Sequence, residues 1–224
     1  MDTNLISLLL QLSLATTQHQ NLYFDVRPRA DFVVAESELR TATALSDINI
    51  GYPKNWINTY RATRIKLNTG MAEGKSESLS AAQIDLIRHA PINSEIGIEV
   101  DYMYNNPVTG IPYFNQAKFT VMVVPDQQAV FLNDHSSVRN YIDQAIKRRN
   151  LVLPKEFSGL QIDFMVDEKG TTIDLTSVKN SNFPSLDKEL FEIICEMPAW
   201  KPAEDSNGKR VKQSLRFSIG TGGC

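Results

Sequence analysis

The last third of the chain alternates apolar and polar residues before the pattern changes to a helical spacing. Residues 160–166 place four apolar side chains on one face of an extended segment, which is typical of a half-buried strand. The sequence from Asp167 to Gly170 predicts a turn, with the glycine where a positive φ is needed. The alternating run 172–178 then returns, so the two segments are expected to form an antiparallel hairpin.

A helix is expected after this hairpin, because apolar residues recur at helical spacing through residues 186–197. Ser185 is the expected N-cap and Pro198 the residue that stops the helix. The Asn-Gly pair at 207–208 is a strong turn signal. A last strand is then expected over 211–219, with apolar side chains on one face and cationic ones on the other.

The first half of the chain also alternates, and it predicts several strands and one or two helices. Ser80 and Gln83 form a capping-box pattern that opens a helix ending near Ala90. A shorter helix is expected between Glu36 and Leu45. The expected strands cover 20–26, at a sheet edge, and then 32–34, 59–68, 95–104 and 116–124.

Other segments of the chain carry weaker signals. Residues 70–75 are expected to form a loop, and the segment around Trp56 is expected to bury its aromatic ring. Ser137 is expected to cap a helix that runs to about Arg149. The basic residues 147–149 suit the carbonyl end of that helix, which explains them without a nucleic acid.

Together these elements predict an α+β protein with two consecutive domains. Residues 20–125 are expected to form a β-rich N-terminal domain with one or two helices. Residues 126–219 are expected to follow the order α-β-β-α-β, with two helices packed on a small antiparallel sheet. Residues 220–224 are expected to form a flexible, glycine-rich tail.

The first nineteen residues contain an apolar run at 5–15 that has two explanations. The run is too short for a bilayer span, which needs about twenty residues, and it fits the apolar region of a secretory signal peptide. No Lys or Arg precedes it, however, and Asp2 does. An amphipathic helix packed on the first domain is the alternative.

The net charge of -3, with both signs spread through the chain, favours neither a nucleic acid nor an anionic lipid as partner. Two cysteines do not make a disulfide framework. Cys195 lies among apolar helical positions and is expected to be buried. Cys224 is expected to be a free thiol, with a disulfide to Cys195 as the alternative.

No set of catalytic or ligand-binding residues is recognisable in the chain. The three histidines lie far apart, and there is no nucleophile elbow, phosphate loop or dinucleotide fingerprint. Asp163 and Asp174 could form a carboxylate pair, but a solvated strand face is the expected role. The sequence therefore predicts no enzyme, no cofactor and no metal ion.

Phrases between residues 159 and 219 resemble the C-terminal domain of TonB, the energy transducer of outer-membrane transport. They are VDEKG, PSLDKEL and MPAWKPAEDSNGKRVKQSLRFS, in that order. The whole chain is similar to a Bacteroidetes group of TonB-like proteins with an extra N-terminal β-rich domain. The resemblance implies mainly structural roles for Gly159, Asp167, Gly170, Leu186, Asp187, Met197, Pro198, Trp200, Pro202, Ala203 and Gly208.

In the TonB family the exposed edge of the small sheet accepts an extended peptide from an outer-membrane receptor. This is β-augmentation, in which main-chain hydrogen bonds supply the affinity. Here the last strand would be that edge, and its cations would favour an acidic peptide or simply discourage self-pairing. The implied partner-binding residues are Val211, Lys212, Gln213, Ser214, Leu215, Arg216 and Phe217.

Two departures from TonB change the expected role. The sequence has no apolar helix of about twenty residues and no proline-rich rod to cross the periplasm. We therefore expect an exported TonB-like adaptor in the periplasm or cell envelope that binds a protein or extended peptide, with a homodimer also open. The alternative is a structural component of an envelope complex, because the first domain resembles gliding-motility and type 9 secretion components.

Overall fold

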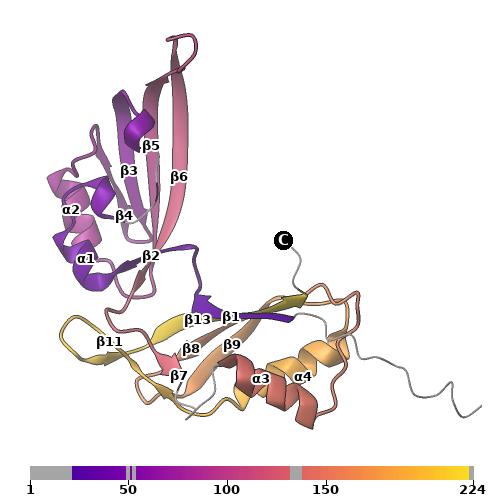
Figure 1. Ribbon diagram of the computed structural model, residues 1–224. Helices are drawn as coiled ribbons and strands as arrows, with labels where there is room; N and C mark the ends of the chain where they lie inside the picture. The colour runs from indigo at the N-terminus through magenta and orange to yellow at the C-terminus, as the bar shows by residue number, and fades with distance from the viewer. Residues whose placement is uncertain (1–21, 49–50, 52–53, 132–137, 222–224) are drawn as a thin grey trace, which may run out of the picture.

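The computed structural model describes residues 22–48, 51, 54–131 and 138–221, and it confirms the α+β class. A five-stranded sheet and a four-stranded sheet each carry two helices. Figure 1 shows the five-stranded sheet standing upright over one end of the four-stranded sheet. The apolar run at 5–15 and the expected cap Ser137 lie outside the described residues.

The five-stranded sheet has the order β2-β6-β5-β3-β4 and is antiparallel except for the parallel pair β2 and β6. Four expected strands are confirmed, but the loop expected at 70–75 is wrong, because this segment pairs with β3 as an edge strand. Its residues have low β-propensity, so the neighbouring strand decides its conformation. The strands are β2 (Phe32–Ala35), β3 (Thr59–Leu67), β4 (Gly70–Gly74), β5 (Glu95–Asn105) and β6 (Pro112–Val124).

Helices α1 (Glu36–Thr41) and α2 (Ala81–Arg88) pack against this sheet, with the short 3-10 turn η1 (Leu45–Asp47) beside them. The 3-10 turn η2 (Lys54–Trp56) lies further out, next to the outer parts of β3 and β5. Alternate residues of β5 form the buried core with apolar residues of both helices. The expected burial of Trp56 is wrong, because its side chain is 72% exposed. In such a short turn no repeating pattern indicates the direction of a side chain.

The capping box predicted at Ser80 is confirmed. The Ser80 hydroxyl oxygen accepts from the Gln83 N–H at 3.3 Å, and the Gln83 Oε1 accepts from the Ser80 N–H at 2.9 Å. Gln83 is fully buried, and its Nε2 donates to the Thr63 carbonyl at 3.1 Å. The cap therefore also anchors α2 to β3.

Replacing Ser80 with alanine is expected to lower the free energy of unfolding by about 1 kcal/mol, because a helix N–H loses its acceptor. Urea denaturation measures this change. Ser80→Asp keeps an acceptor at the cap and is expected to cost less. Equal losses for the two variants would contradict the assigned role of the hydroxyl group.

The four-stranded sheet has the order β1-β13-β8-β9 and is antiparallel throughout. Helices α3 (Val138–Arg148) and α4 (Pro184–Cys195) pack on one of its faces. The strands are β1 (Leu22–Pro28), β8 (Leu160–Val166), β9 (Thr172–Lys179) and β13 (Gln213–Thr221). Two separate two-stranded pairs accompany this sheet: β7 (Val130–Phe131) with β10 (Trp200–Lys201), and β11 (Ala203–Glu204) with β12 (Arg210–Val211).

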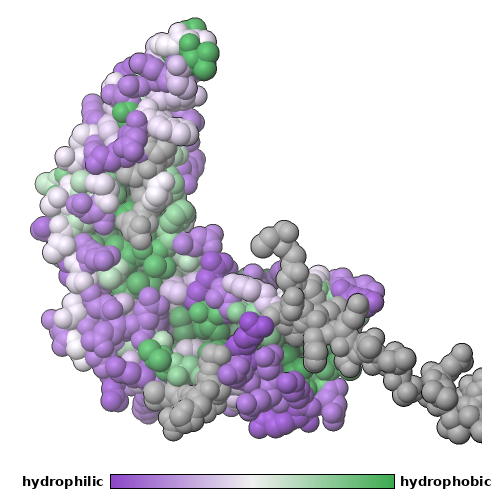
Figure 2. All heavy atoms as spheres, in the orientation of Figure 1, coloured by the Kyte–Doolittle hydropathy of each residue, from purple (hydrophilic) through white to green (hydrophobic). Residues whose placement is uncertain are grey.

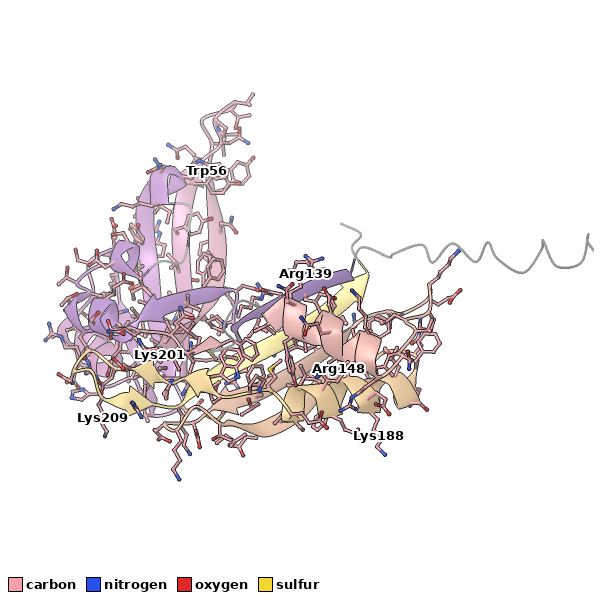
Figure 3. The ribbon with its side chains drawn as sticks, turned by 60° about the horizontal axis from the view of Figure 1, so that its bottom comes forward. Trp56, Arg139, Arg148, Lys188, Lys201 and Lys209 are labelled. Atoms are coloured by element: carbon pink, nitrogen blue, oxygen red, sulfur yellow. The ribbon has the colours of Figure 1, made fainter. Side chains whose placement is uncertain are left out.

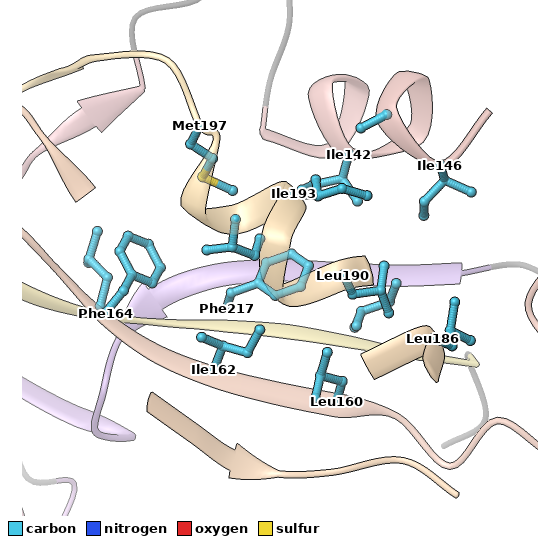
Figure 4. Packing of buried hydrophobic residues seen from close by; sticks show 14 of the residues in the cluster. Ile142, Ile146, Leu160, Ile162, Phe164, Leu186, Leu190, Ile193, Met197 and Phe217 are labelled. Carbon is cyan, nitrogen blue, oxygen red and sulfur yellow. The ribbon is translucent and has the colours of Figure 1, made fainter. Parts of the chain in front are cut away.

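Figure 4 shows the core between this sheet and its helices. Ile162 and Phe164 of β8 and Phe217 of β13 lie beneath Ile142 of α3 and Ile193 of α4, all of them buried. The alternation predicted for 160–166 is therefore confirmed. Burying one face of each strand is what specifies the register of the sheet.

Two local expectations in this unit are wrong. Helix α4 begins at Pro184, so Ser185 lies inside the helix, and the N-cap position, Phe183, makes no side-chain cap bond. The Asp187 carboxylate instead accepts from the Ser181 N–H at 2.9 Å. The strand expected over 211–219 is interrupted after Val211.

Cys195 is exposed, contrary to the expected burial. Ile193 and Ile194 face the core, and each further residue turns about 100° around a helix, which carries the next side chain away from the sheet. Gly220 and Thr221 extend β13 rather than opening a tail. The remaining tail residues, including Cys224, lie outside the described part of the chain.

Strand β1 changes the domain organisation. It was expected in the N-terminal domain, but it pairs with β13 over seven residues. The chain then crosses to β2 and the other sheet. The two units also meet through Asn93, whose Nδ2 donates to the Lys212 carbonyl at 2.9 Å and whose Oδ1 accepts from the Ser214 N–H at 2.8 Å.

Candidate protein-binding edge of the four-stranded sheet

Strand β13, expected to be an exposed edge, lies inside the sheet. It pairs with β8 from Gln213 to Ile219 on one side and with β1 from Leu215 to Thr221 on the other. Figure 1 shows the indigo β1 lying along the yellow β13. The sequence did not indicate that β13 is covered, because pairing between residues almost two hundred positions apart leaves no local signal in either segment.

The expected partner-binding residues mostly serve the fold. Leu215 and Phe217 are buried in the core, and Gln213 is also fully buried. The Gln213 Oε1 accepts from the Ala129 N–H at 2.7 Å, and its Nε2 donates to the Gln128 Oε1 at 3.3 Å. A buried amide that satisfies the backbone of another segment is a structural group.

The cationic side chains expected beside β13 differ in whether they already form an ion pair or are exposed to solvent. Arg216 makes a two-pronged contact with Asp163, its directly opposite neighbour in β8, with N–O distances of 2.6 and 3.0 Å. The hydrogen bonds that Arg216 donates to the Asp163 carboxylate raise the pKa of the Arg216 guanidinium above its usual value. Arg216 is therefore already paired, and Asp163 is its partner in this ion pair. Lys209, Arg210 and Lys212 are exposed.

The glycines of the TonB-like phrases have positive φ for identifiable reasons. Gly170 has a φ of 85°, and its carbonyl accepts from the Trp200 N–H at 2.8 Å, so the two backbones touch. Gly159 has a φ of 92°, and a Cβ there would lie 2.9 Å from the Ile219 carbonyl oxygen. Gly208 has a φ of 75° in an open turn. All three turns need a residue that tolerates this conformation.

Asp167 orders the turn between β8 and β9. Its carboxylate accepts from the Thr171 N–H at 2.8 Å and from the Lys169 N–H at 2.9 Å. These backbone hydrogen bonds, that of Thr171 foremost, lower the pKa of Asp167. The carboxylate thus stabilises the hairpin turn and is not left free for a ligand.

Trp200 packs, as expected. It is 4% exposed, and its ring lies 5.2 Å from that of Phe131 and 5.8 Å from that of Phe164, centroid to centroid. Trp200 begins strand β10, and Pro198 and Pro202 lie on either side of that strand. Leu186, Met197 and Ala203 are buried as well. These residues of the resemblance form the core and its border.

The basic cluster at the end of α3 is partly neutralised. Arg149 contacts Glu189, Glu192 and Glu196 of the α4 region at 2.8, 3.1 and 2.7 Å. These contacts raise the pKa of Arg149. Arg149 therefore ties α3 to α4, while Lys147 and Arg148 stay exposed.

The pairing of strand β1 with β13 is the feature of this border that the sequence did not reveal. Among the side chains of β1 that the structure describes, two apolar ones pack against the core: Phe24, 6.4 Å from the Phe217 ring between centroids, and Val26, both partly buried. The Arg139 guanidinium lies 5.9 Å from the centre of the Phe24 ring, and Figure 3 shows Arg139 above this strand. The alternation of residues 22–26 predicted an edge strand but could not name the sheet.

A shallow hollow of about 270 Å³ follows this edge on the open face of the sheet. Charged and polar side chains of β1 border it, and it reaches across β13 to β8 and the end of β9. It offers polar contacts to whatever extended segment lies along this side. Its lining includes Tyr23, Asp25, Arg27, Gln161, Lys179 and Ser218.

The two borders of the sheet differ. Among the described residues, no strand pairs with the outer side of β1 or of β9. Strand β9 is irregular, with two register shifts against β8 and a φ of 53° at Asp174. Such bulges hinder strand addition. The β1 side, with unbroken register, is the regular border.

Within the described residues, no group of three His, Cys, Asp or Glu side chains could hold a metal ion. None of the described helices combines the length and the apolar composition that a membrane crossing requires. No family model matches the chain, and no curated protein or solved structure matches it.

Proposed function

We propose that this chain is an exported, TonB-like protein-binding module that accepts an extended peptide by strand addition at β13, in the place that β1 holds. The observation that carries the proposal is the pairing of β1 with β13. A segment from the far end of the chain adds to this sheet over seven residues without a bulge. The β13 edge thus has the regular geometry that a strand-accepting edge needs.

The weak anchoring of β1 supports exchange. Its inward side chains Phe24 and Val26 are only partly buried, whereas Leu215, Phe217 and Ile219 of β13 are buried. Main-chain hydrogen bonds, which any strand can form, therefore contribute much of its attachment. A partner would need apolar residues at the positions of Phe24 and Val26 and polar residues between them.

A reversible crosslink tests the exchange. Asp25 and Ser218 are opposite neighbours, so Asp25→Cys with Ser218→Cys should form a disulfide that holds β1 in place. The background carries Cys195→Ser and Cys224→Ser. The probe is a fluorescent peptide of residues 20–30, which copies β1. We expect binding to the reduced protein and at least about ten-fold weaker binding to the oxidised protein, because β1 cannot leave.

Two controls sharpen this experiment. The pair Glu99→Cys and Lys118→Cys crosslinks opposite residues of the other sheet, and its oxidation should leave binding unchanged. Phe24→Asp weakens the tethered strand, whose effective concentration is on the order of mM, so it should tighten peptide binding. Equal binding to the oxidised and reduced forms would refute exchange at β13.

The envelope setting rests on the resemblance of residues 159–219 to TonB. If it holds, an outer-membrane receptor captured from envelope extracts should be released when the Asp25–Ser218 crosslink forms. A structural component of an envelope complex is the second candidate. The hydrogen bonds of Asn93 to the Lys212 carbonyl and the Ser214 N–H favour it, because they join the two units into one surface. Co-purification that is insensitive to the crosslink would support this candidate instead.

A further inference from the structure

The hairpin of β5 and β6 ends in an apolar tip that projects beyond the rest of the molecule (Figure 1). At this tip Val108 is 90% exposed and Ile111 53%, and Phe114, which lies further back on β6 opposite Met103, is 62% exposed. Figure 2 shows apolar side chains gathered at the end of the hairpin. Large apolar side chains gathered on a protrusion, rather than scattered singly, mark an interaction surface.

The backbone of the tip satisfies its own polar groups. The Asn106 side-chain oxygen accepts from the N–H groups of Val108 and Thr109, at 2.8 and 3.1 Å. The Asn106 carbonyl accepts from the Gly110 N–H at 2.8 Å, and the Asn106 N–H donates to the Ile111 carbonyl at 2.9 Å. A turn closed in this way can enter an apolar medium without leaving these groups unpaired.

The tip carries no charge. No Asp, Glu, Lys or Arg occurs between Asp101 and Lys118, a stretch that covers the ends of both strands and the turn. Attraction by charge, whether to an acidic peptide or to anionic lipid, is therefore not what this surface provides. What this surface provides is apolar area that a partner can bury.

Aromatic side chains with polar ends lie just behind the tip. The rings of Tyr104 and Tyr113 stack with centroids 6.0 Å apart. Trp56 is 72% exposed, and Figure 3 places it beside the outer part of the hairpin. Its turn is tied there by Asn58, whose N–H donates to the Met103 carbonyl at 2.9 Å. Tyr and Trp are the side chains enriched where lipid meets water.

Along the two strands of the hairpin itself, charged residues begin only behind the stacked tyrosines. Arg64 contacts Asp101 at 2.8 Å, and Lys66 contacts Glu99 at 2.7 Å. At about 3.3 Å per residue, Tyr104 of the stacked tyrosines lies about 13 Å along the strand from Val108, and Asp101 and Glu99 of the ion pairs lie about 23 and 30 Å from it. Along one axis the hairpin thus passes from apolar to aromatic to charged.

We propose that the tip of this hairpin inserts into the interface of a lipid bilayer. The order of the three zones follows the order of acyl chains, headgroups and water, and an interfacial element enters by about 5–10 Å. A protein groove would require apolar residues but no such sequence of zones. Because the tip is uncharged, insertion does not depend on anionic lipid. This inference is independent of the proposed strand exchange.

The chain contains a natural probe for the test. It has two tryptophans, of which Trp200 is buried and Trp56 exposed at the hairpin. Adding phosphatidylcholine vesicles to the full chain is expected to shift the Trp56 emission to shorter wavelength, and brominated lipid is expected to quench it. Flotation with the vesicles measures the bound fraction.

Matched variants isolate the tip. Val108→Asp places a charge at the apolar end and is expected to reduce the bound fraction by about ten-fold and to remove the emission shift. Val152→Asp, at a site 82% exposed in the other unit, is expected to change neither. Both sites are exposed, so both variants should unfold like the unmodified chain. The apolar run at 5–15 is present in all three proteins and cannot produce a difference among them.

Several results would overturn the proposal. An unchanged Trp56 emission with vesicles would show that the tip stays in water. Equal binding by Val108→Asp and the unmodified chain would assign binding to another segment. Binding confined to anionic vesicles and abolished by salt would indicate a basic surface. If Val108→Asp instead abolishes binding to a protein while vesicles are not bound, the tip is a protein-docking surface.

Discussion

Replacing Gly170 with alanine is expected to lower the free energy of unfolding by roughly 3–5 kcal/mol. The residue has a φ of 85°, which costs a residue with a Cβ about 1–3 kcal/mol. The added Cβ would also overlap the carbonyl oxygen of Trp200, and forcing atoms into a filled site costs about 1–3 kcal/mol more. Relieving the overlap would separate the β8–β9 turn from β10. Urea denaturation followed by circular dichroism measures the loss.

Gly208→Ala is the matched control for this prediction. Gly208 has a similar φ of 75°, but nothing lies within 4 Å of an added Cβ. Its replacement should therefore cost only the conformational part, about 1–3 kcal/mol. Equal losses at the two sites would mean that contact with Trp200 contributes nothing, contrary to the packing described above.

Phe217→Ala is expected to cost about 3–5 kcal/mol, because it removes a fully buried ring from the centre of the core under α3 and α4. The ring also faces Phe24, so the variant should loosen β1. In the assay of the proposed strand exchange, however, the same substitution removes part of the surface on which a peptide would lie. Thermal unfolding measures the first effect.

Phe114→Ala provides the comparison at an exposed ring. Phe114 lies on the outer part of β6, opposite Met103, and is 62% exposed, so its loss should change stability by no more than about 0.5 kcal/mol. A large loss would mean that the outer part of the hairpin has a role in the fold, which would weaken its assignment as an interaction surface. The two substitutions thus separate residues that hold the sheet from residues that face a partner.

The pairing of β1 with the edge of β13 also affects the solubility of the protein. An exposed regular strand edge is a template for pairing between chains. With β1 in place, the border of the sheet becomes a strand that carries Asp25 and Arg27 and ends in Pro28, and each of these residues discourages further pairing. Phe24→Asp, which weakens this cover, would therefore expose an adhesive edge.

Local periodicity was enough to predict elements whose partners lie nearby in the chain. The hairpin of β8 and β9, the helix opened by Ser80 and the long β5–β6 hairpin all follow from alternation, turn residues and caps. Their formation depends on neighbours within about twenty residues, and one buried face specifies each register. The α+β class follows from the same signals.

Other features depend on contacts that local periodicity does not record. Residues 70–74 are a strand because β3 offers them a partner, and Trp56 is exposed because its short turn points it away from the core. The residues of β13 were recognised as a strand, but whether that strand was an edge depended on β1.

The sequence accordingly predicted which residues alternate, turn and cap, since these properties depend on near neighbours and side-chain chemistry. It did not predict that the first described strand closes the last sheet. Two segments at opposite ends of a chain meet only when the whole fold forms, and main-chain hydrogen bonds between strands are the same for almost any sequence. The identity of the covered edge, and with it the form of the candidate site, is therefore a property of the tertiary structure.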